Sequence, residues 1–213
     1  MKSIRFLLSI VGALTISILA GELAIAQATA KAPVVFTEKD REFALKYAGD
    51  TKDDFVKQLT GLSEAQLNFR AADGRWTIGE IAEHIIVVEN ALRGMVEGGM
   101  KSPVPACKDE FRIQDMSVIL TITNRQQKFQ APEQVRPNGR WKTVADLLTN
   151  FETARNTSTD YMKNMKEDMR SHFANMPFGR IDAFQAYLFM IGHGERHLAQ
   201  LKEVKADAKY PAK

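Results

Sequence analysis

The sequence predicts an all-α protein: an antiparallel four-helix bundle preceded by an N-terminal signal peptide. Two observations predict the bundle. Apolar residues recur at helical spacing in four long segments, and helix-capping residues stand at the start of each segment. A third observation is negative, since no stretch shows the alternation of a half-buried β-strand. Helices that each have one apolar face bury those faces most simply against one another in a bundle.

The first 26 residues have the pattern of a cleavable signal peptide. Lys2 and Arg5 precede a mostly apolar run over residues 6–20, and Ala24-Ile25-Ala26 has the small residues that signal peptidase accepts. The apolar run is shorter than the roughly 18–20 residues that a membrane-spanning helix needs, which favours cleavage after Ala26 over anchoring. We therefore expect a domain of residues 27–213 in the periplasm or secreted, with no membrane anchor.

The composition is that of one ordinary globular domain. The 213 residues include 29 basic and 26 acidic side chains of interleaved sign, so the charge balance gives no support for nucleic-acid binding. Cys107 is the only cysteine, which excludes an internal disulfide. It follows Pro103 and Pro105 in an expected loop, and we interpret it as an incidental thiol.

The first half of the chain predicts two long helices. Thr37 caps a helix that is expected to reach about residue 62. A connection over residues 63–76 has a short capping box of its own at Ser63, and Asp73-Gly74 marks a turn within it. Thr77 and Glu80 form a second capping box, which begins a helix that ends near residues 98–99.

The second half predicts two more long helices and one shorter one. A helical pattern over residues 115–128 is the shorter one, and the prolines of residues 129–142 indicate a long loop. Thr143 opens a helix that continues to about residue 166. Asp182 begins the last helix, which reaches about residue 205.

Histidines are the side chains that indicate chemistry. The chain has only four, and His193 and His197 stand four residues apart on the last helix, so their rings share one face. His84 lies within the second long helix. Three imidazoles from two facing helices would hold one divalent metal ion and leave coordination positions for water or substrate. Three imidazoles suit zinc, nickel, copper and iron alike.

The alternative interpretation is a surface pair on the last helix and a lone buried His84. The apolar residues 85–88 and 189–191 favour the metal interpretation, because they place His84 and His193 at the margin of a buried stripe. His172 is expected to be an exposed loop histidine, and a place at the mouth of a pocket is its alternative.

Other side chains receive weaker assignments. Glu89 lies about 140° around the helix from His84, where it orients a ligand, acts as a base or, as we favour, forms a structural ion pair. Trp76 is expected to cap the core with its ring. Glu195 should point away from the face of the histidine pair, and His-Gly-Glu-Arg-His does not have the order of a zincin protease.

Three blocks of sequence resemble the DinB/YfiT-like superfamily. Residues 74–84 lead through a tryptophan and a threonine cap to His84, residues 139–146 open a helix, and residues 182–200 contain His193, His197 and a trailing glutamine. The resemblance extends over roughly residues 45–205 and implies a four-helix bundle with a three-histidine site for zinc, nickel or iron.

The resemblance implies two classes of function. Some members are thiol-dependent S-transferases or isomerases, which implies a metal-dependent transferase or hydrolase that acts on a small molecule. Many have no known activity, which leaves a non-catalytic metal- or ligand-binding module as the alternative. A bundle that mediates protein contacts, for example as a homodimer, is a third interpretation of the same sequence.

Overall fold

The computed structural model describes residues 34–103, 113–176 and 179–212. The expected signal peptide at residues 1–26 and the loop cysteine Cys107 lie outside the described residues. Within these three ranges, no helix is both long and apolar enough to cross a membrane.

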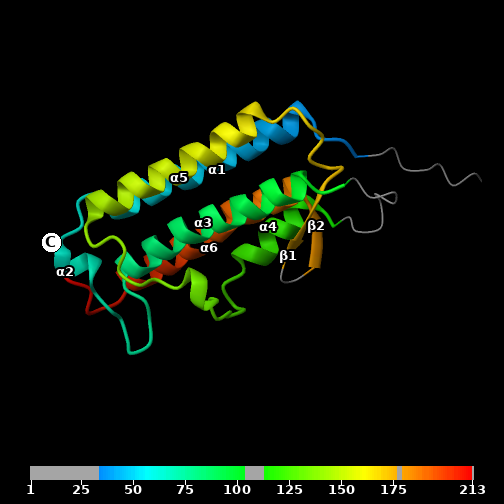
Figure 1. Ribbon diagram of the computed structural model, residues 1–213. Coiled ribbons are helices and arrows are strands. Elements are labelled where there is room, and N and C mark those ends of the chain that lie inside the picture. Colours follow the sequence, from blue (N-terminus) through cyan, green and yellow to red (C-terminus); the bar gives the residue numbers. More distant parts are fainter. Residues whose placement is uncertain (1–33, 104–112, 177–178, 213) are drawn as a thin grey trace, which may run out of the picture. The chain divides into compact units, whose positions relative to one another are not determined.

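Four long helices dominate the described part of the chain (Figure 1). They are α1 (Glu38–Leu59), α3 (Ile78–Met100), α5 (Val144–Asn164) and α6 (Ala183–Lys205). The shorter elements are α2 (Glu64–Leu67), α4 (Asp115–Thr123), the 3-10 turn η1 (Glu133–Val135) and the strands β1 (Phe173–Met176) and β2 (Gly179–Asp182).

The predicted caps explain why the helices start where they do. In each capping box the side chain of the first residue accepts from the backbone three residues on, and that residue reciprocates, which satisfies two otherwise unpaired groups. Reciprocal boxes of this kind begin at Thr37, Ser63, Thr77 and Asp182. Thr143 caps α5 through one bond, from the Asp146 amide.

The helices do not simply alternate in direction along the chain. One core cluster joins the N-terminal halves of α3 and α5 to the C-terminal halves of α1 and α6, and the other cluster joins the opposite halves. The pairs α1–α5 and α3–α6 are therefore antiparallel, as predicted, whereas α3 and α5 run in the same direction (Figure 1). α3 ends and α5 begins at opposite ends of the bundle, and α4, which packs on α6, lies between them in the chain.

The β-hairpin contradicts the expectation of a chain without strands. β1 and β2 pair antiparallel, with Phe173 opposite Asp182 and Met176 opposite Gly179. The strands are short, and three of the four β1 residues are buried, so an alternating pattern was absent from the sequence. The hairpin packs against α3 at Gly99, where an added Cβ would lie 2.8 Å from the Phe173 carbonyl oxygen.

The third predicted helix is shorter than expected, because α4 ends at Thr123 and not near residue 128. The Arg196 guanidinium of α6 donates to the carbonyls of Ile122, Asn124 and Gln127. In a continuing helix these carbonyls would accept from backbone amides instead. Arg196 thereby fixes the chain that leaves α4.

Candidate metal centre

The three predicted histidines converge between α3 and α6. One nitrogen from each of His84, His193 and His197 lies within 4.8 Å of the other two. The ring centroids of His193 and His197 are 4.5 Å apart, and the His84 centroid lies 5.1 Å from that of His193 and 4.6 Å from that of His197. Because zinc–nitrogen bonds are about 2.0–2.1 Å long, small ring movements suffice for one ion to reach all three. The i,i+4 spacing on α6 and the antiparallel packing of α3 produce this convergence.

Hydrogen bonds select the nitrogen that two of the rings offer. Nδ1 of His84 lies 2.7 Å from the Val135 carbonyl oxygen, and Nδ1 of His197 lies 2.8 Å from Oε1 of Gln200. Both partners are acceptors, so each Nδ1 holds the proton and leaves Nε2 with a free electron pair. Arg125 also donates to Oε1 of Gln200 at 3.5 Å, which fits its orientation as an acceptor. Metal-binding histidines characteristically have such a partner on their other nitrogen.

The environment keeps all three imidazoles neutral at pH 7. Burial lowers the pKa of His84, although the Val135 carbonyl opposes that shift. Burial and the neighbouring rings lower the pKa of His193 well below its ordinary value, and burial and His84 lower that of His197 to about 3. Neutral imidazole is the form that binds a metal, so this set of donors fits a divalent ion.

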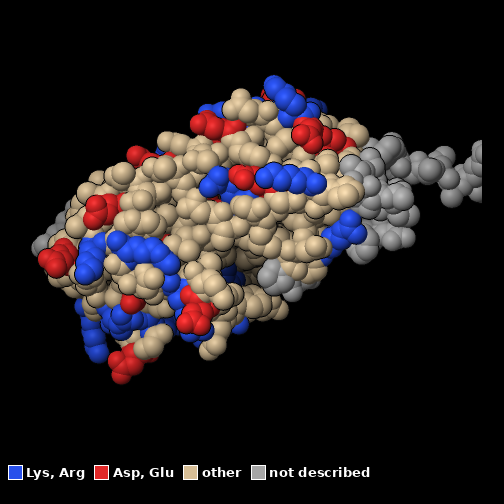
Figure 2. All heavy atoms as spheres, in the orientation of Figure 1, with Lys and Arg blue, Asp and Glu red and all other residues tan. Residues whose placement is uncertain are grey.

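Trp76 borders the cluster on the side where α3 begins. Its ring centroid lies 4.7 Å from that of His84 and 6.2 Å from that of His197. The half-buried ring also packs against the core, as predicted. The face of the molecule in Figure 2 has a hollow in the area between α4 and η1.

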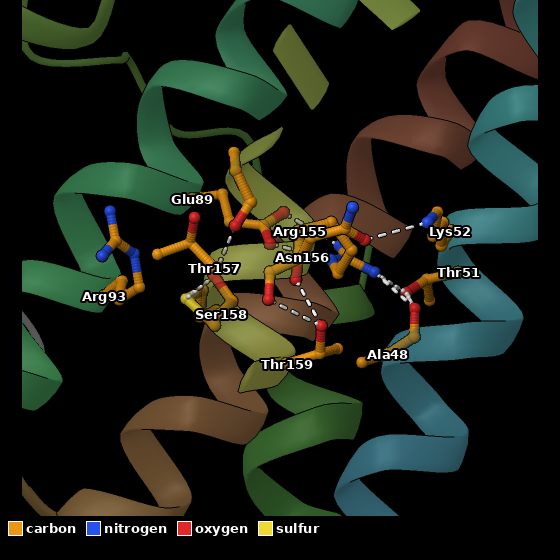
Figure 3. A network of polar contacts seen from close by, with 12 residues as sticks. Ala48, Thr51, Lys52, Glu89, Arg93, Arg155, Asn156, Thr157, Ser158 and Thr159 are labelled. Atoms are coloured by element: carbon orange, nitrogen blue, oxygen red, sulfur yellow. Dashed lines mark hydrogen bonds and ion pairs between the residues drawn. The ribbon is translucent and has the colours of Figure 1, made fainter. Parts of the chain in front are cut away.

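The carboxylate Glu89 faces an arginine and not the histidines. Both of its oxygens accept from Arg155, at 2.7 and 2.9 Å, and both side chains are almost completely buried. Arg155 also donates to the Ala48 carbonyl and the Thr51 hydroxyl of α1 (Figure 3). This geometry is the structural ion pair that we favoured for Glu89 over a ligand-orienting or basic role.

Two further glutamates near the histidines also have partners. Glu195 accepts a hydrogen bond from the Tyr47 hydroxyl of α1, and it points away from the histidine face as predicted. Glu83, beside His84, accepts from three backbone amides of the loop before α5. Sequence reasoning missed this contact, although Asn138-Gly139 signals the turn that creates it.

His172 does not join the cluster, and its expected exposure is wrong. Its side chain is 13% exposed, and Nδ1 lies 3.1 Å from the Ser102 carbonyl oxygen, beside the hairpin. The packing of β1 on the end of α3 covers it. This histidine therefore provides a natural control for the three that converge.

The fold is a helical bundle, and the site brings three neutral imidazoles together around one point. These two features define a class of protein, the helical bundles with a candidate site for a single metal ion. The family model of the DinB superfamily matches residues 49–201, so the chain belongs to the DinB superfamily.

Two relatives from Bacillus subtilis are similar to this chain. Uncharacterized protein YuaE of strain 168 is 23% identical over 150 residues, which cover 70% of this chain and 88% of that protein. The solved structure of YfiT, described as a probable metal-dependent hydrolase with an unusual four-helix bundle topology, has a TM-score of 0.54 at 12% identity. It covers 83% of this chain and 91% of YfiT. At this identity the likeness shows the fold.

Proposed function

We propose that this protein binds one divalent metal ion through His84, His193 and His197 and uses it to hydrolyse a small-molecule substrate. The observation that supports the proposal most is the convergence of the three imidazoles, two of which have Nδ1 tied to an acceptor. The description of YfiT as a probable metal-dependent hydrolase points to the same class of reaction. Transfer to a thiol is the close variant, since the same site would activate either nucleophile.

The metal would supply the electrophile: a divalent ion with an open position polarises a substrate oxygen and activates water near neutral pH. The protein supplies the rest. The rings of His84, His193 and His197 provide three neutral donors and leave the charge of the ion uncompensated. Trp76 presents an aromatic surface beside the rings. Zinc, nickel and iron are the metals that we propose.

We also propose that the protein works outside the cytoplasm. The support is the pattern of residues 1–26, with its basic start, apolar run and small residues at 24–26. The test is N-terminal sequencing of the protein recovered from the periplasm or medium of a host that expresses the full chain. A mature N-terminus at Gln27 is the expected result. Intact full-length protein confined to the cytoplasm would contradict export.

A non-catalytic metal- or ligand-binding module is the second candidate, and one observation favours it. Three glutamates within five residues of these histidines in the sequence are each engaged, Glu83 with the loop before α5, Glu89 with Arg155 and Glu195 with Tyr47. None of these carboxylates is free to act as a general base, so the protein would rely on the metal alone to activate a nucleophile.

The experiment compares metal-loaded and metal-free protein on a panel of small esters, amides, lactams and phosphoesters, with water alone and with added thiols. Hydrolysis that requires the metal and disappears in His193→Ala, but persists in His172→Ala, is the expected result. Protein that holds one metal per chain and yet turns over no member of the panel would favour the binding module.

A further inference from the structure

The buried carboxylate Glu83 has an unusual set of partners. It lies on α3 directly before His84, and its side chain is 2% exposed. Its oxygens accept from the backbone amides of Asn138, Gly139 and Arg140, at 2.8, 3.0 and 3.2 Å, and from the Arg140 guanidinium at 2.8 Å. Four donors, one of them charged, bind this loop to α3 more strongly than a typical surface contact would.

The same loop supplies the acceptor for His84. Val135, at the end of η1, places its carbonyl oxygen 2.7 Å from Nδ1 of His84. Only two residues separate Val135 from Asn138. Because Asn138 is held by Glu83, the Val135 carbonyl can lie at most about 10 Å along the chain from that fixed point. Glu83 and His84 are adjacent on α3, and they hold two points of one loop segment. The position of the Val135 carbonyl therefore depends on the Glu83 anchor.

From this geometry we infer that Glu83 is a positioning residue of the metal centre. It acts through the loop: the anchored segment holds the Val135 carbonyl, and that carbonyl keeps the proton of His84 on Nδ1 and the ring in its orientation. Without the anchor, His84 loses the partner that directs Nε2 toward the other two rings. The inference rests on the proposed metal site, and it assigns a role to a residue that does not itself touch the ion.

Coupling of this kind works in both directions. If the docked loop favours metal binding by some factor, bound metal favours the docked loop by the same factor. Arg140, which precedes Trp141, lies in this segment and is a site for trypsin. Metal should therefore slow tryptic cleavage there in the wild-type protein, which gives a readout independent of activity.

The test measures zinc affinity by competition with a chromophoric chelator in Glu83→Ala, Glu83→Gln and a control. The control is Glu80→Gln on the same helix, where the carboxylate accepts from Arg70 and from the Thr77 amide and does not contact the loop. We expect Glu83→Ala to weaken zinc binding by about 10–100-fold with helicity retained. Glu83→Gln should fall between it and the wild type, because its amide oxygen still accepts, and the control should match the wild type.

A folded Glu83→Ala variant with wild-type zinc affinity would overturn the inference and leave the proposed function intact. If that variant does not fold, Glu83→Gln decides, and wild-type affinity there would equally overturn it. Equal losses of zinc affinity in Glu83→Gln and in the Glu80→Gln control would show a general effect of lowered stability, and they would also overturn the inference. A wild-type protein that binds no zinc, nickel or iron would remove the proposed function, and the inference with it.

Discussion

The buried pair of Glu89 and Arg155 gives the prediction with the largest expected effect on stability. The exposed fractions of the two side chains are 2% and 1%, and two charge-assisted hydrogen bonds join them. Replacement of Glu89 by leucine leaves the guanidinium buried with only the Ala48 carbonyl and the Thr51 hydroxyl as partners. A buried charge that loses its partner costs about 3–5 kcal/mol. Against a total of about 5–15 kcal/mol, the variant should still fold.

The assay is urea unfolding followed by circular dichroism. With a denaturant slope of about 2 kcal/mol/M, the midpoint should fall by about 1.5–2.5 M in Glu89→Leu, and similarly in Arg155→Met. The double variant should recover most of the loss, because two apolar side chains of similar size replace the pair. All variants that remain folded should bind metal like the wild type. A stability loss below about 1 kcal/mol together with lost metal binding would refute the structural role and make Glu89 part of the site.

Three further predictions follow from the packing and the site. Gly99→Ala should destabilise, since its Cβ would meet the Phe173 backbone, whereas Gly98→Ala, with open space, should stabilise by about 0.5–1 kcal/mol in thermal unfolding; equal effects would refute the close approach. In the metal-free protein, the pKa of His197 is near 6.5 in the unfolded state and about 3 in the folded state, where the ring is buried. The contribution of His197 to the free energy of unfolding should therefore be fully present above pH 6.5 and fall by up to about 1.4 kcal/mol per pH unit toward pH 3, so the total should fall less steeply in His197→Asn; equal slopes in urea titrations would contradict this. Zinc at about 100 times its dissociation constant should raise the free energy of unfolding by about 2.7 kcal/mol, in the wild type and in His172→Ala alike, and an absent shift would count against the site.

Local chemistry explains which parts of the fold the sequence could predict. A capping box needs only four consecutive residues, so the starts of α1, α3 and α6 at Thr37, Thr77 and Asp182 were visible without any tertiary information. The shared direction of α3 and α5 depends on the path of a long connection, which no local pattern records. The hairpin was missed because its strands are short and are held by packing on α3.

The site divides in the same way. The spacing of His193 and His197 places both rings on one face of any helix, and His84 was the remaining helical histidine, so the cluster could be predicted. The partners of Glu89 and Glu83 could not, because Arg155 lies 66 residues along the chain from the first, and Asn138 lies 55 residues from the second. Such pairs arise only from tertiary packing.

Metal stoichiometry tests the central claim most directly. Protein purified without a histidine tag is freed of metal, titrated with zinc, nickel and iron(II), and analysed by elemental mass spectrometry beside His193→Ala/His197→Ala and His172→Ala variants. The account predicts about one equivalent of a divalent metal in the wild type and in His172→Ala, and none in the double variant, with helicity unchanged. No bound metal in the wild type, or an undiminished equivalent in the double variant, would contradict it.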